Sequence, residues 1–415
     1  MSHTLQTLKG FRDFYGVQAH KRMWLVGIFR QVFESYGFGP LETPALEYES
    51  LLLGKYGDEA NKLIYSFEDR GGRRVAMRYD QTVPTARVVA QYQNELLFPY
   101  KRYQIQPVWR SEKPQKGRYR EFTQCDIDII GSDSPIADAQ ILAVTSEVMR
   151  TLDLPVVMKI NDREQLIRLI NHAGIPPEKT FSVIQTIDKL DKKSSSEVVE
   201  ELREKGISQE TSDVLFKLLQ DAKPTDKLAQ IIRYAHSMGV PESALAFTPA
   251  LARGLDYYTG MIFEPIVADY KSGSLGGGGR YDRLIEELVG VSLPATGMAF
   301  GFDRILEVLD ALGKFPADLA QPARALITIF SEDSALYNLS IYRLLQKNNI
   351  AVELYPHTKK KIEAQIKYAS TNKIPFVVIA GEQEQQSKMV TIKDLATREQ
   401  KTVDLPTLIQ LLKNP

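Results

Sequence analysis

The sequence contains a single cysteine, Cys125, among its 415 residues. One thiol excludes an intramolecular disulfide and a cysteine-based metal cluster. Long apolar runs are also missing: stretches such as residues 376–380 are far too short to span a bilayer, and the first residues lack the charged and apolar regions of a signal peptide. We therefore expect a soluble, cytoplasmic protein whose chemistry uses groups other than thiols.

An excess of either charge is absent as well, because 52 Lys and Arg balance 52 Asp and Glu. The overall charge thus indicates no nucleic-acid partner. Local basic segments at residues 113–120 and 359–361 are candidates for one, although a charge run is usually a solvated face. With 43% hydrophobic and 25% charged residues, the composition is that of an ordinary globular protein of two or three domains.

Hydrophobic periodicity predicts an N-terminal helix followed by a β-rich region. Apolar side chains recur at helical spacing from Trp24 to Tyr36, and Gly37 ends this helix. Beyond it, we expect strands at residues 64–67, 74–79, 103–110 and 120–130, with the last two paired as a hairpin.

Two later regions differ in character. Between residues 161 and 236 the periodicity is helical, with a capping box from Ser194 to Glu197 at the start of one helix and Gly206 at its end. This stretch is typical of an inserted helical module. After a connector containing Pro322, strands expected at 325–330, 352–354 and 376–380 alternate with helices at 334–347 and 361–371. That alternation predicts a small α/β domain with a mixed or parallel sheet.

The most informative segment is ARGLDYYTG, residues 252–260. It places Arg253, Asp256, Tyr257 and Tyr258 along an otherwise apolar strand, and such groups are buried only when they are paired. We expect this strand to form the wall of a pocket. Since adjacent side chains of a regular strand face opposite sides, both tyrosines can contact one ligand only if the strand twists or bulges near a glycine.

Alternation in the expected strand at 120–130 separates polar from apolar side chains. It places Gln124, Asp126 and Asp128 on one face and Cys125, Ile127 and Ile129 on the other. Such a polar face is by itself more often solvated, but Arg110 on the partner strand and a loop rich in Gln, Gly, Lys and Arg favour a cleft. Cys125, on the apolar face, is expected to be buried and inert.

Residues 297–304 read as a strand that runs through glycines into a helix. Asp303 is the expected N-cap of this helix. Arg304 adds a full cation to the partial positive charge of the helix N-terminus, which is unfavourable for the helix alone and favourable if a phosphate binds there. A plain surface arginine is the alternative.

Together these segments resemble the class II aminoacyl-tRNA synthetases. The segment WRSE at 109–112 with the loop through 120–122 resembles motif 2, GFDR at 301–304 resembles motif 3, and residues 37–44 resemble motif 1. Within that class, RGLDYYTG at 253–260, GGRYD at 278–282 and PQKGRYREF at 114–122 are similar to the histidyl-tRNA synthetase family. The order of the segments agrees along essentially the whole chain.

The resemblance implies an α/β fold with a class II antiparallel β-sheet catalytic core flanked by helices. That core is expected over residues 1–320 and contains a helical insertion at 162–245, while a C-terminal mixed α/β anticodon-binding domain is expected over 322–415. The resemblance also implies a homodimer, formed through residues 37–44, and no membrane association. L-histidine, ATP and tRNA-His are the implied substrates. Mg²⁺ is expected to neutralise the triphosphate, without a metal-binding cluster of side chains.

The implied reaction has two steps. The carboxylate of histidine attacks the α-phosphate of ATP to give histidyl-adenylate and pyrophosphate, and a ribose hydroxyl at the tRNA 3′ end then attacks the acyl carbon. Phosphoryl transfer needs positioning and cations more than a nucleophilic side chain. By resemblance, the catalytic residues are Arg110 at the α-phosphate and substrate carboxylate, Arg253 on the other side of the α-phosphate, and Arg304 at the γ-phosphate.

The resemblance also implies the binding residues. Those for histidine are Asp80, Thr82, Arg110, Gln124, Asp128, Arg253, Tyr257 and Tyr258; those for ATP are Arg110, Glu112, Phe122 and Arg304; those for the tRNA acceptor end are Gln115, Arg118 and Arg120. Asp80, Thr82 and Gln124 are expected at the α-ammonium, and Asp128 and the tyrosines at the ring. A neutral imidazole has one donor and one acceptor, so both ring nitrogens need a partner.

Other functions stay open at this point. A non-catalytic histidine-sensing relative, such as the regulatory subunit of ATP phosphoribosyltransferase, would bind histidine, but such relatives tend to lose the tRNA domain and the motifs that this chain retains. A class II synthetase for glycine, proline or threonine would share the anticodon-binding domain but not RGLDYYTG. A plain α/β structural protein would leave the three arginines unexplained.

Overall fold

The computed structural model describes residues 5–53, 63–113, 119–191, 193–253, 257–267, 270, 273–317, 319, 323–329 and 331–413. The chain divides into two compact units, one of Met1–Phe14 with Arg22–Lys314 and the other of Tyr15–Lys21 with Phe315–Pro415. Among the described helices, none is both long and apolar enough to cross a membrane.

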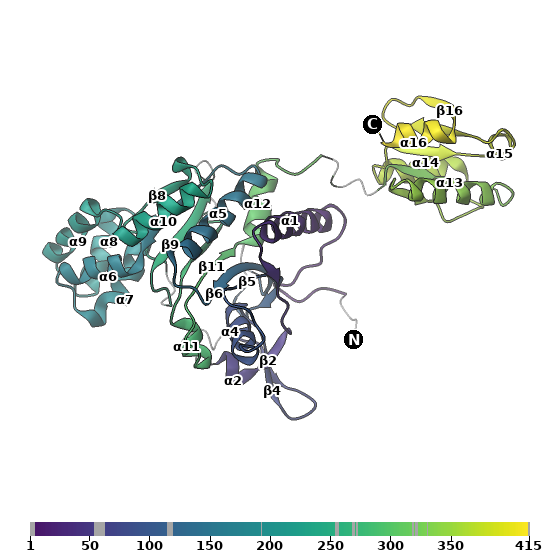
Figure 1. Cartoon of the computed structure of the whole chain (residues 1–415). Helices are drawn as coiled ribbons and strands as arrows, with labels where there is room; N and C mark the ends of the chain where they lie inside the picture. Colours follow the sequence, from purple (N-terminus) through teal and green to yellow (C-terminus); the bar gives the residue numbers. More distant parts are fainter. Residues whose placement is uncertain are drawn as a thin grey trace. The chain divides into compact units, whose positions relative to one another are not determined.

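The larger unit is built on an eight-stranded sheet, counted over the described residues, in the order β1-β5-β6-β11-β10-β9-β7-β8. Its strands are β1 (Gly39–Pro40), β5 (Tyr100–Trp109), β6 (Glu121–Ile130), β7 (Val156–Asp162), β8 (Leu245–Phe247), β9 (Met261–Val267), β10 (Gly276–Arg280) and β11 (Ala295–Phe300). Strands β5, β6, β8, β9 and β11 of this sheet are labelled in Figure 1. Pairing is antiparallel except at the two edges, where β1 runs parallel to β5 and β8 runs parallel to β7. The predicted antiparallel core and the predicted β5–β6 hairpin are confirmed.

One face of this sheet is covered by α1 (Gly16–Ser35), the helix predicted from apolar spacing. Phe29 packs against Phe300 of β11 with ring centroids 5.1 Å apart, and Phe33 packs against Tyr103 of β5 at 5.6 Å. Gly37 follows the helix with φ +78°, a left-handed conformation that glycine adopts without strain, so the predicted end is confirmed. Helices α5 (Pro135–Thr151) and α12 (Phe302–Ala311) also contact the sheet.

A smaller antiparallel sheet lies in the same unit, in the order β2-β4-β3. Its elements are β2 (Leu46–Tyr48), α2 (Glu49–Leu52), β3 (Ser66–Glu68) and β4 (Arg74–Met77), followed by α4 (Thr82–Gln91) and, much later in the chain, α11 (Leu284–Val289). An apolar cluster joins α4 to α11, with Val83 and Leu284 among its buried members. This packing holds α4 in place, and with it Thr82, the first residue of that helix.

The predicted helical module is present between β7 and β8. Its helices are α6 (Arg163–His172), η1 (Pro177–Lys179), α7 (Thr180–Ile187), η2 (Asp188–Asp191), α8 (Ser195–Glu204), α9 (Gln209–Asp221), α10 (Asp226–Ser237) and η3 (Glu242–Ala244). The predicted capping box is confirmed, because the Ser194 hydroxyl accepts from the Glu197 N–H while the Glu197 carboxylate accepts from the Ser194 N–H. Gly206 follows α8 at φ +76°.

The strand expected across residues 252–260 is wrong. Within this stretch the described residues, 252–253 and 257–260, lie outside any strand, and β9 begins only at Met261. Arg253 has φ +52°, and its backbone N–H donates to the Asp188 carboxylate at 2.9 Å rather than to a neighbouring strand. A left-handed residue interrupts the extended conformation that a strand requires.

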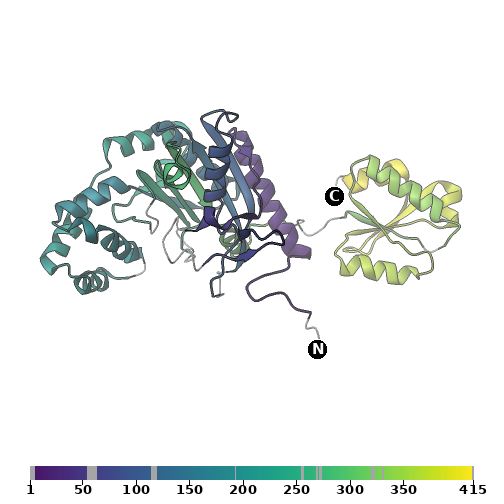
Figure 2. The ribbon, with the colours of Figure 1, turned by 90° about the horizontal axis from the view of Figure 1, so that it is seen from below.

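The C-terminal unit has a five-stranded mixed sheet, in the order β13-β12-β14-β15-β16. Its elements are β12 (Ala325–Ile327), α13 (Ala335–Lys347), β13 (Val352–Leu354), α14 (Ile362–Thr371), β14 (Phe376–Ile379), α15 (Glu382–Ser387), β15 (Met389–Asp394), β16 (Gln400–Asp404) and α16 (Leu405–Lys413). The predicted βαβαβ order is confirmed, and β15, β16, α15 and α16 extend it. The sheet lies between helices on both faces (Figure 2), with α13 and α16 on one side and α14 on the other.

Candidate active site

The strand register of the large sheet sets the floor of the site. Two rows of paired Cα atoms cross four strands: Gln104, Asp126, Ala299 and Gly277 form one, and Arg102, Asp128, Gly297 and Gly279 form the next. Because directly paired residues share a face of the sheet, polar side chains of β5 and β6 lie beside glycine and alanine of β10 and β11. The predicted alternation is confirmed, since Cys125 and Ile127 are buried on the apolar side.

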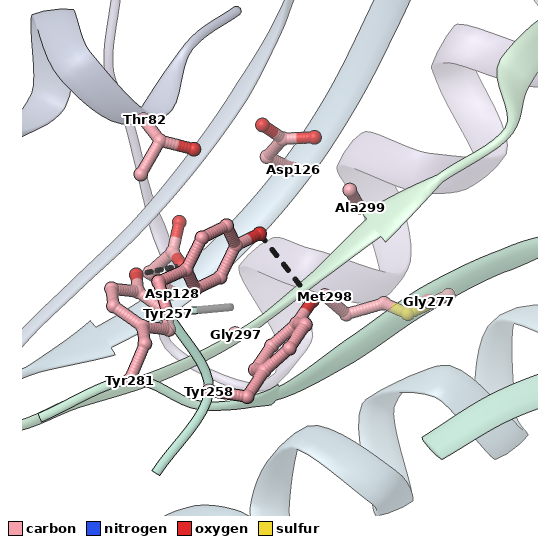
Figure 3. A pocket seen from close by; sticks show the side chains of 10 residues that line it. All are labelled: Thr82, Asp126, Asp128, Tyr257, Tyr258, Gly277, Tyr281, Gly297, Met298 and Ala299. Carbon is pink, nitrogen blue, oxygen red and sulfur yellow. Dashed lines mark hydrogen bonds between the residues drawn. The ribbon is translucent and has the colours of Figure 1, made fainter. Parts of the chain in front are cut away.

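A pocket opens over this floor (Figure 3). Its lining residues are Thr82, Asp126, Asp128, Tyr257, Tyr258, Gly277, Tyr281, Gly297, Met298 and Ala299. Four predicted histidine contacts therefore come together here: Thr82, Asp128, Tyr257 and Tyr258. Asp126 and Tyr281 also line the pocket, although neither was among the binding residues predicted from the sequence. Asp126 belongs to the polar face predicted for β6, and Tyr281 belongs to the GGRYD segment.

Three aromatic rings form one wall of the pocket. The Tyr257 and Tyr258 centroids lie 4.6 Å apart, and Tyr281 meets Tyr257 edge-on at 6.0 Å. The Tyr257 hydroxyl donates to the Tyr258 hydroxyl at 3.5 Å. Both adjacent tyrosines reach the pocket because they precede β9 instead of lying within a strand.

Asp128 lies at the base of this aromatic wall. The Tyr281 hydroxyl donates to its Oδ1, and Arg102 forms an ion pair with its Oδ2. Burial raises the pKa of Asp128 above its ordinary value, although the Arg102 charge limits the rise. Burial and the Asp128 charge raise the pKa of Tyr281 well above its ordinary value, so this phenol keeps its proton and acts as a donor.

Gly297 is required beside this carboxylate. A Cβ on Gly297 would overlap the Asp128 side chain and the Ile127 carbonyl. The absence of a side chain on β11 therefore lets the Asp128 carboxylate lie across the neighbouring strand and face the pocket.

Asp80 and Gln124 lie near the pocket but do not line it. Asp80 precedes α4, and its Oδ1 accepts from the Val83 N–H at 3.2 Å. Burial raises the pKa of Asp80 to about 6, although hydrogen bonds from Val83 and Thr82 and the charge of Arg110 oppose the rise. Gln124, on β6, donates through Nε2 to Asp126 Oδ2 at 2.8 Å.

The three predicted catalytic arginines lie on segments outside the strands and do not line the pocket. Arg110 donates through Nε to the Tyr79 carbonyl at 3.0 Å, and its guanidinium carbon lies 5.1 Å from the centre of the Phe122 ring. Arg304 is exposed and donates to the Ser274 carbonyl.

Arg253 borders the pocket through Gly277, which lines it. Its Nη1 donates to the Gly276 carbonyl at 3.2 Å and lies 3.5 Å from the Glu264 carboxylate. A Cβ on Gly277 would collide with this guanidinium, so β10 admits the arginine only because it carries glycine there.

The expected N-cap of α12 is wrong. Gly301 occupies the cap position, and Asp303 lies inside the first turn. The Asp303 Oδ1 instead accepts from Arg12 at 3.1 Å and from Arg22 at 2.8 Å, so this carboxylate ties α12 to the N-terminal part of the larger unit. An ion pair with two guanidiniums competes successfully with a single backbone donor for the same carboxylate.

The loop between β5 and β6 is closed at its base by Arg120. Its Nε donates to the Glu112 carbonyl at 3.0 Å, and its backbone N–H donates to the Gly10 carbonyl at 2.9 Å. The other two predicted tRNA contacts, Gln115 and Arg118, lie outside the described residues. No group of three or more His, Cys, Asp or Glu side chains is arranged to hold a metal ion in the part of the chain that the structure describes.

The chain is similar to known proteins along most of its length. A family model described as histidyl-tRNA synthetase matches residues 10–305, and a model described as anticodon binding domain matches residues 325–414. A histidine–tRNA ligase from Gloeobacter violaceus is 38% identical and covers 98% of this chain and 98% of its own length. One from Rhodopirellula baltica is 38% identical and covers 96% of this chain and 95% of its own length.

Solved structures share the fold. The crystal structure of histidyl-tRNA synthetase from a Nostoc species has a TM-score of 0.87 at 28% identity and covers 99% of both chains. A structure from Bacillus halodurans, described as an ATP phosphoribosyltransferase regulatory subunit/histidyl-tRNA synthetase, has a TM-score of 0.73 at 19% identity. It covers 89% of this chain and 97% of its own, and it shares the fold alone.

Proposed function

The chain belongs to the histidyl-tRNA synthetase family, and we propose that the pocket at Thr82, Asp128 and Tyr281 is where it activates L-histidine. As an aminoacyl-tRNA synthetase it is a ligase that uses ATP. The carboxylate of histidine attacks the α-phosphate, histidyl-adenylate forms and pyrophosphate leaves. The ribose hydroxyl at the 3′ end of tRNA-His then attacks the acyl carbon, and AMP leaves.

The buried Asp128–Tyr281 pair carries the assignment of the ring subsite. Asp128 accepts a hydrogen bond from Tyr281 and forms an ion pair with Arg102, so the position of its carboxylate is fixed. A ring N–H of histidine would donate to this carboxylate. The hydroxyls of Tyr257 and Tyr258 lie on the same wall and supply a donor for the second ring nitrogen. An amino acid without two ring nitrogens would leave one of these groups unpaired, which disfavours its binding.

The proposed α-ammonium subsite consists of Asp80, Thr82 and Gln124. Thr82 lines the pocket, while Asp80 approaches it from the start of α4. We propose that Arg110, which donates to the Tyr79 carbonyl, and Arg253, which donates to the Gly276 carbonyl, would hold the substrate carboxylate and the α-phosphate between them. Two cations at that place stabilise the charge that accumulates in phosphoryl transfer.

For ATP we propose that adenine stacks on Phe122 and bonds to Glu112, and that the γ-phosphate binds Arg304. The present contact of Arg110 with the Phe122 ring supports a flat, cation-flanked surface at that position. Arg304 is exposed in the first turn of α12, where phosphate would meet backbone N–H groups as well as the guanidinium. Mg²⁺ would enter with ATP as part of the substrate, since it prefers phosphate oxygens and water as ligands.

The tRNA would be bound by both units. Gln115, Arg118 and Arg120 are the proposed contacts of the acceptor end, and residues 322–415 form the proposed anticodon-binding domain, within which the anticodon-domain model matches 325–414. We also propose a homodimer formed through residues 37–44 and a cytoplasmic location. The histidine-sensing alternative is not favoured, because the relatives over the full length are histidine–tRNA ligases.

The test is exchange of labelled pyrophosphate into ATP, without tRNA, with each amino acid in turn. We expect exchange with histidine alone, and a loss of roughly 10²–10³-fold in Arg253→Ala, because one charge-stabilising donor of the transition state is removed. Arg203→Ala is the matched control: Arg203 is exposed on α8 and pairs with Glu200. Equal exchange with glutamine would contradict the ring subsite, and an unaffected Arg253→Ala would contradict the role of that arginine.

A further inference from the structure

Two buried oxygen atoms on the polar face of β6 have neither a hydrogen-bond donor nor an ion-pair partner among the described residues, whereas Asp128 Oδ2 is paired with Arg102. They are Oδ1 of Asp126 and Oε1 of Gln124. Asp126 is only 4% exposed, and its side chain lines the pocket beside Thr82 and Ala299 (Figure 3). Buried polar atoms are nearly always paired in folded proteins, so these two oxygens indicate a ligand that supplies donors.

The contact between the two side chains fixes which of their polar atoms are paired. Asp126 Oδ2 accepts from Gln124 Nε2 at 2.8 Å. A carboxylate accepts and does not donate, so the Gln124 amide must turn its NH₂ group toward Asp126 and keep its carbonyl oxygen for another partner. Asp126 thereby orients Gln124 and also leaves its own second oxygen available.

The charges that act on Asp126 include two carboxylates and one guanidinium. Asp80 and Asp128 both repel its carboxylate, and Arg102 attracts it. Arg102, however, is buried in an ion pair with Asp128 and lies beside Asp128 in the sheet register. A ligand with a positive charge would therefore offset the excess of carboxylates on this floor.

We propose that Asp126 is a further substrate-binding residue, whose free carboxylate oxygen extends the subsite of Asp80, Thr82 and Gln124 for the α-ammonium of histidine. An ammonium has three N–H donors and no acceptor, which matches unpaired oxygens of two side chains and the surplus negative charge. The imidazole is assigned elsewhere in the pocket, because its proposed acceptor Asp128 lies with Tyr281, apart from Asp126 (Figure 3). The inference rests on the proposed function, which puts histidine in this pocket.

The experiment compares three ligands on wild type and Asp126→Asn by calorimetry or by competition in pyrophosphate exchange. L-histidine and histidinol carry the ammonium, whereas imidazolepropionate lacks it. In Asp126→Asn we expect about 10–100-fold weaker binding of histidine and histidinol, the range for a lost hydrogen bond to a charged group, and unchanged binding of imidazolepropionate. Asp133→Asn, at an exposed position outside the pocket, should leave all three affinities unchanged.

Each outcome decides the assignment. Equal weakening of all three ligands in Asp126→Asn would overturn it, and so would unchanged affinity for histidine. Asp126→Ser, which also removes the carboxylate, gives the same comparison if the asparagine variant does not fold. Failure of the wild type to bind histidine would instead overturn the proposed function, and is thereby distinct from a failure of this inference.

Discussion

The floor of the proposed amino-acid pocket and the segments that carry Arg110, Arg253 and Arg304 are built in opposite ways. On the floor, charged groups lie inside a sheet: Arg102 is 1% exposed, Asp128 is 6% exposed, and each is held by the other. The arginines proposed for ATP lie outside strands, and Arg253 is 20% exposed while Arg304 is exposed. They donate mainly to backbone carbonyls.

Solvation explains the difference. A buried charge is costly unless a partner of opposite charge is fixed beside it. Arg102 and Asp128 of the floor are therefore paired before a ligand binds. A polyphosphate carries several negative charges, and the arginines proposed to bind it need no fixed protein carboxylate beside them. These arginines stay hydrated until the ligand binds. Mutations on the floor should therefore change stability and histidine binding together, whereas mutations of the arginine-bearing segments should lower the rate of activation with little change in stability.

The largest effect is expected for Asp128→Asn. This change leaves the buried Arg102 without its counterion, which typically costs about 3–5 kcal/mol, and it also removes the proposed acceptor for the ring. Urea denaturation should show the lost stability, and histidine affinity should fall with it. Tyr281→Phe is the matched control, because it removes one hydrogen bond to the same carboxylate and leaves the ion pair intact. Full stability in Asp128→Asn would break the comparison.

Asp80→Asn should have a smaller effect of opposite sign on stability. The pKa of Asp80 rises from 3.8 in the unfolded chain to about 6 in the folded protein, so the folded state binds its proton more tightly. The charged Asp80 carboxylate therefore lowers the free energy of unfolding above pH 6, by roughly 1–3 kcal/mol. This destabilisation disappears below pH 4, where the carboxyl group is protonated in both the folded and the unfolded chain. We expect Asp80→Asn to be more stable than wild type at pH 7, equally stable at pH 4, and weaker in histidine binding.

Urea denaturation at both pH values, followed by calorimetry with histidine, checks this prediction. A stability difference that does not change with pH would show that burial of the Asp80 charge is not its cause. Asp133→Asn provides the control for an exposed carboxylate, at which the difference should be within about 0.5 kcal/mol at either pH.

The smallest effect is expected for Gly277→Ala. The added Cβ would displace the Arg253 guanidinium without removing its charge, so pyrophosphate exchange should fall by about tenfold, since a displacement of about 1 Å near the chemistry can cost more than this. The thermal midpoint should change little. Gly27→Ala is the control, because a Cβ there meets open space. If Gly277→Ala lowers stability as much as Asp128→Asn does, the proposed difference between the pocket floor and the arginine-bearing segments is wrong.

Local patterns predicted much of the fold. Apolar spacing located α1, the Ser194–Glu197 capping box located α8, and period-two alternation put Asp126 and Asp128 on the face of β6 that lines the pocket. These features depend on neighbours within a few residues, which the sequence states directly. The motif order likewise identified the family, whose model matches residues 10–305.

Two predictions were wrong for a shared reason. Residues 252–260 were expected to form a strand, but the Arg253 backbone N–H bonds to Asp188, 65 residues earlier in the chain. Asp303 was expected to cap its helix, but its carboxylate binds Arg12 and Arg22, almost the whole unit away in sequence. In both cases a long-range partner changed what the local sequence favoured.

The sequence by itself determined the family, the kind of reaction, the alternation of β6 and the residue types available for chemistry. Only the tertiary structure decided which of these residues share a site. Tyr281 reaches Asp128 across 153 positions of sequence because β10 and β11 pair with each other and β11 pairs with β6. Strand register between distant segments depends on the packing of the whole sheet, so no local pattern could have placed Tyr281, Arg102 and the second oxygen of Asp126 around one pocket.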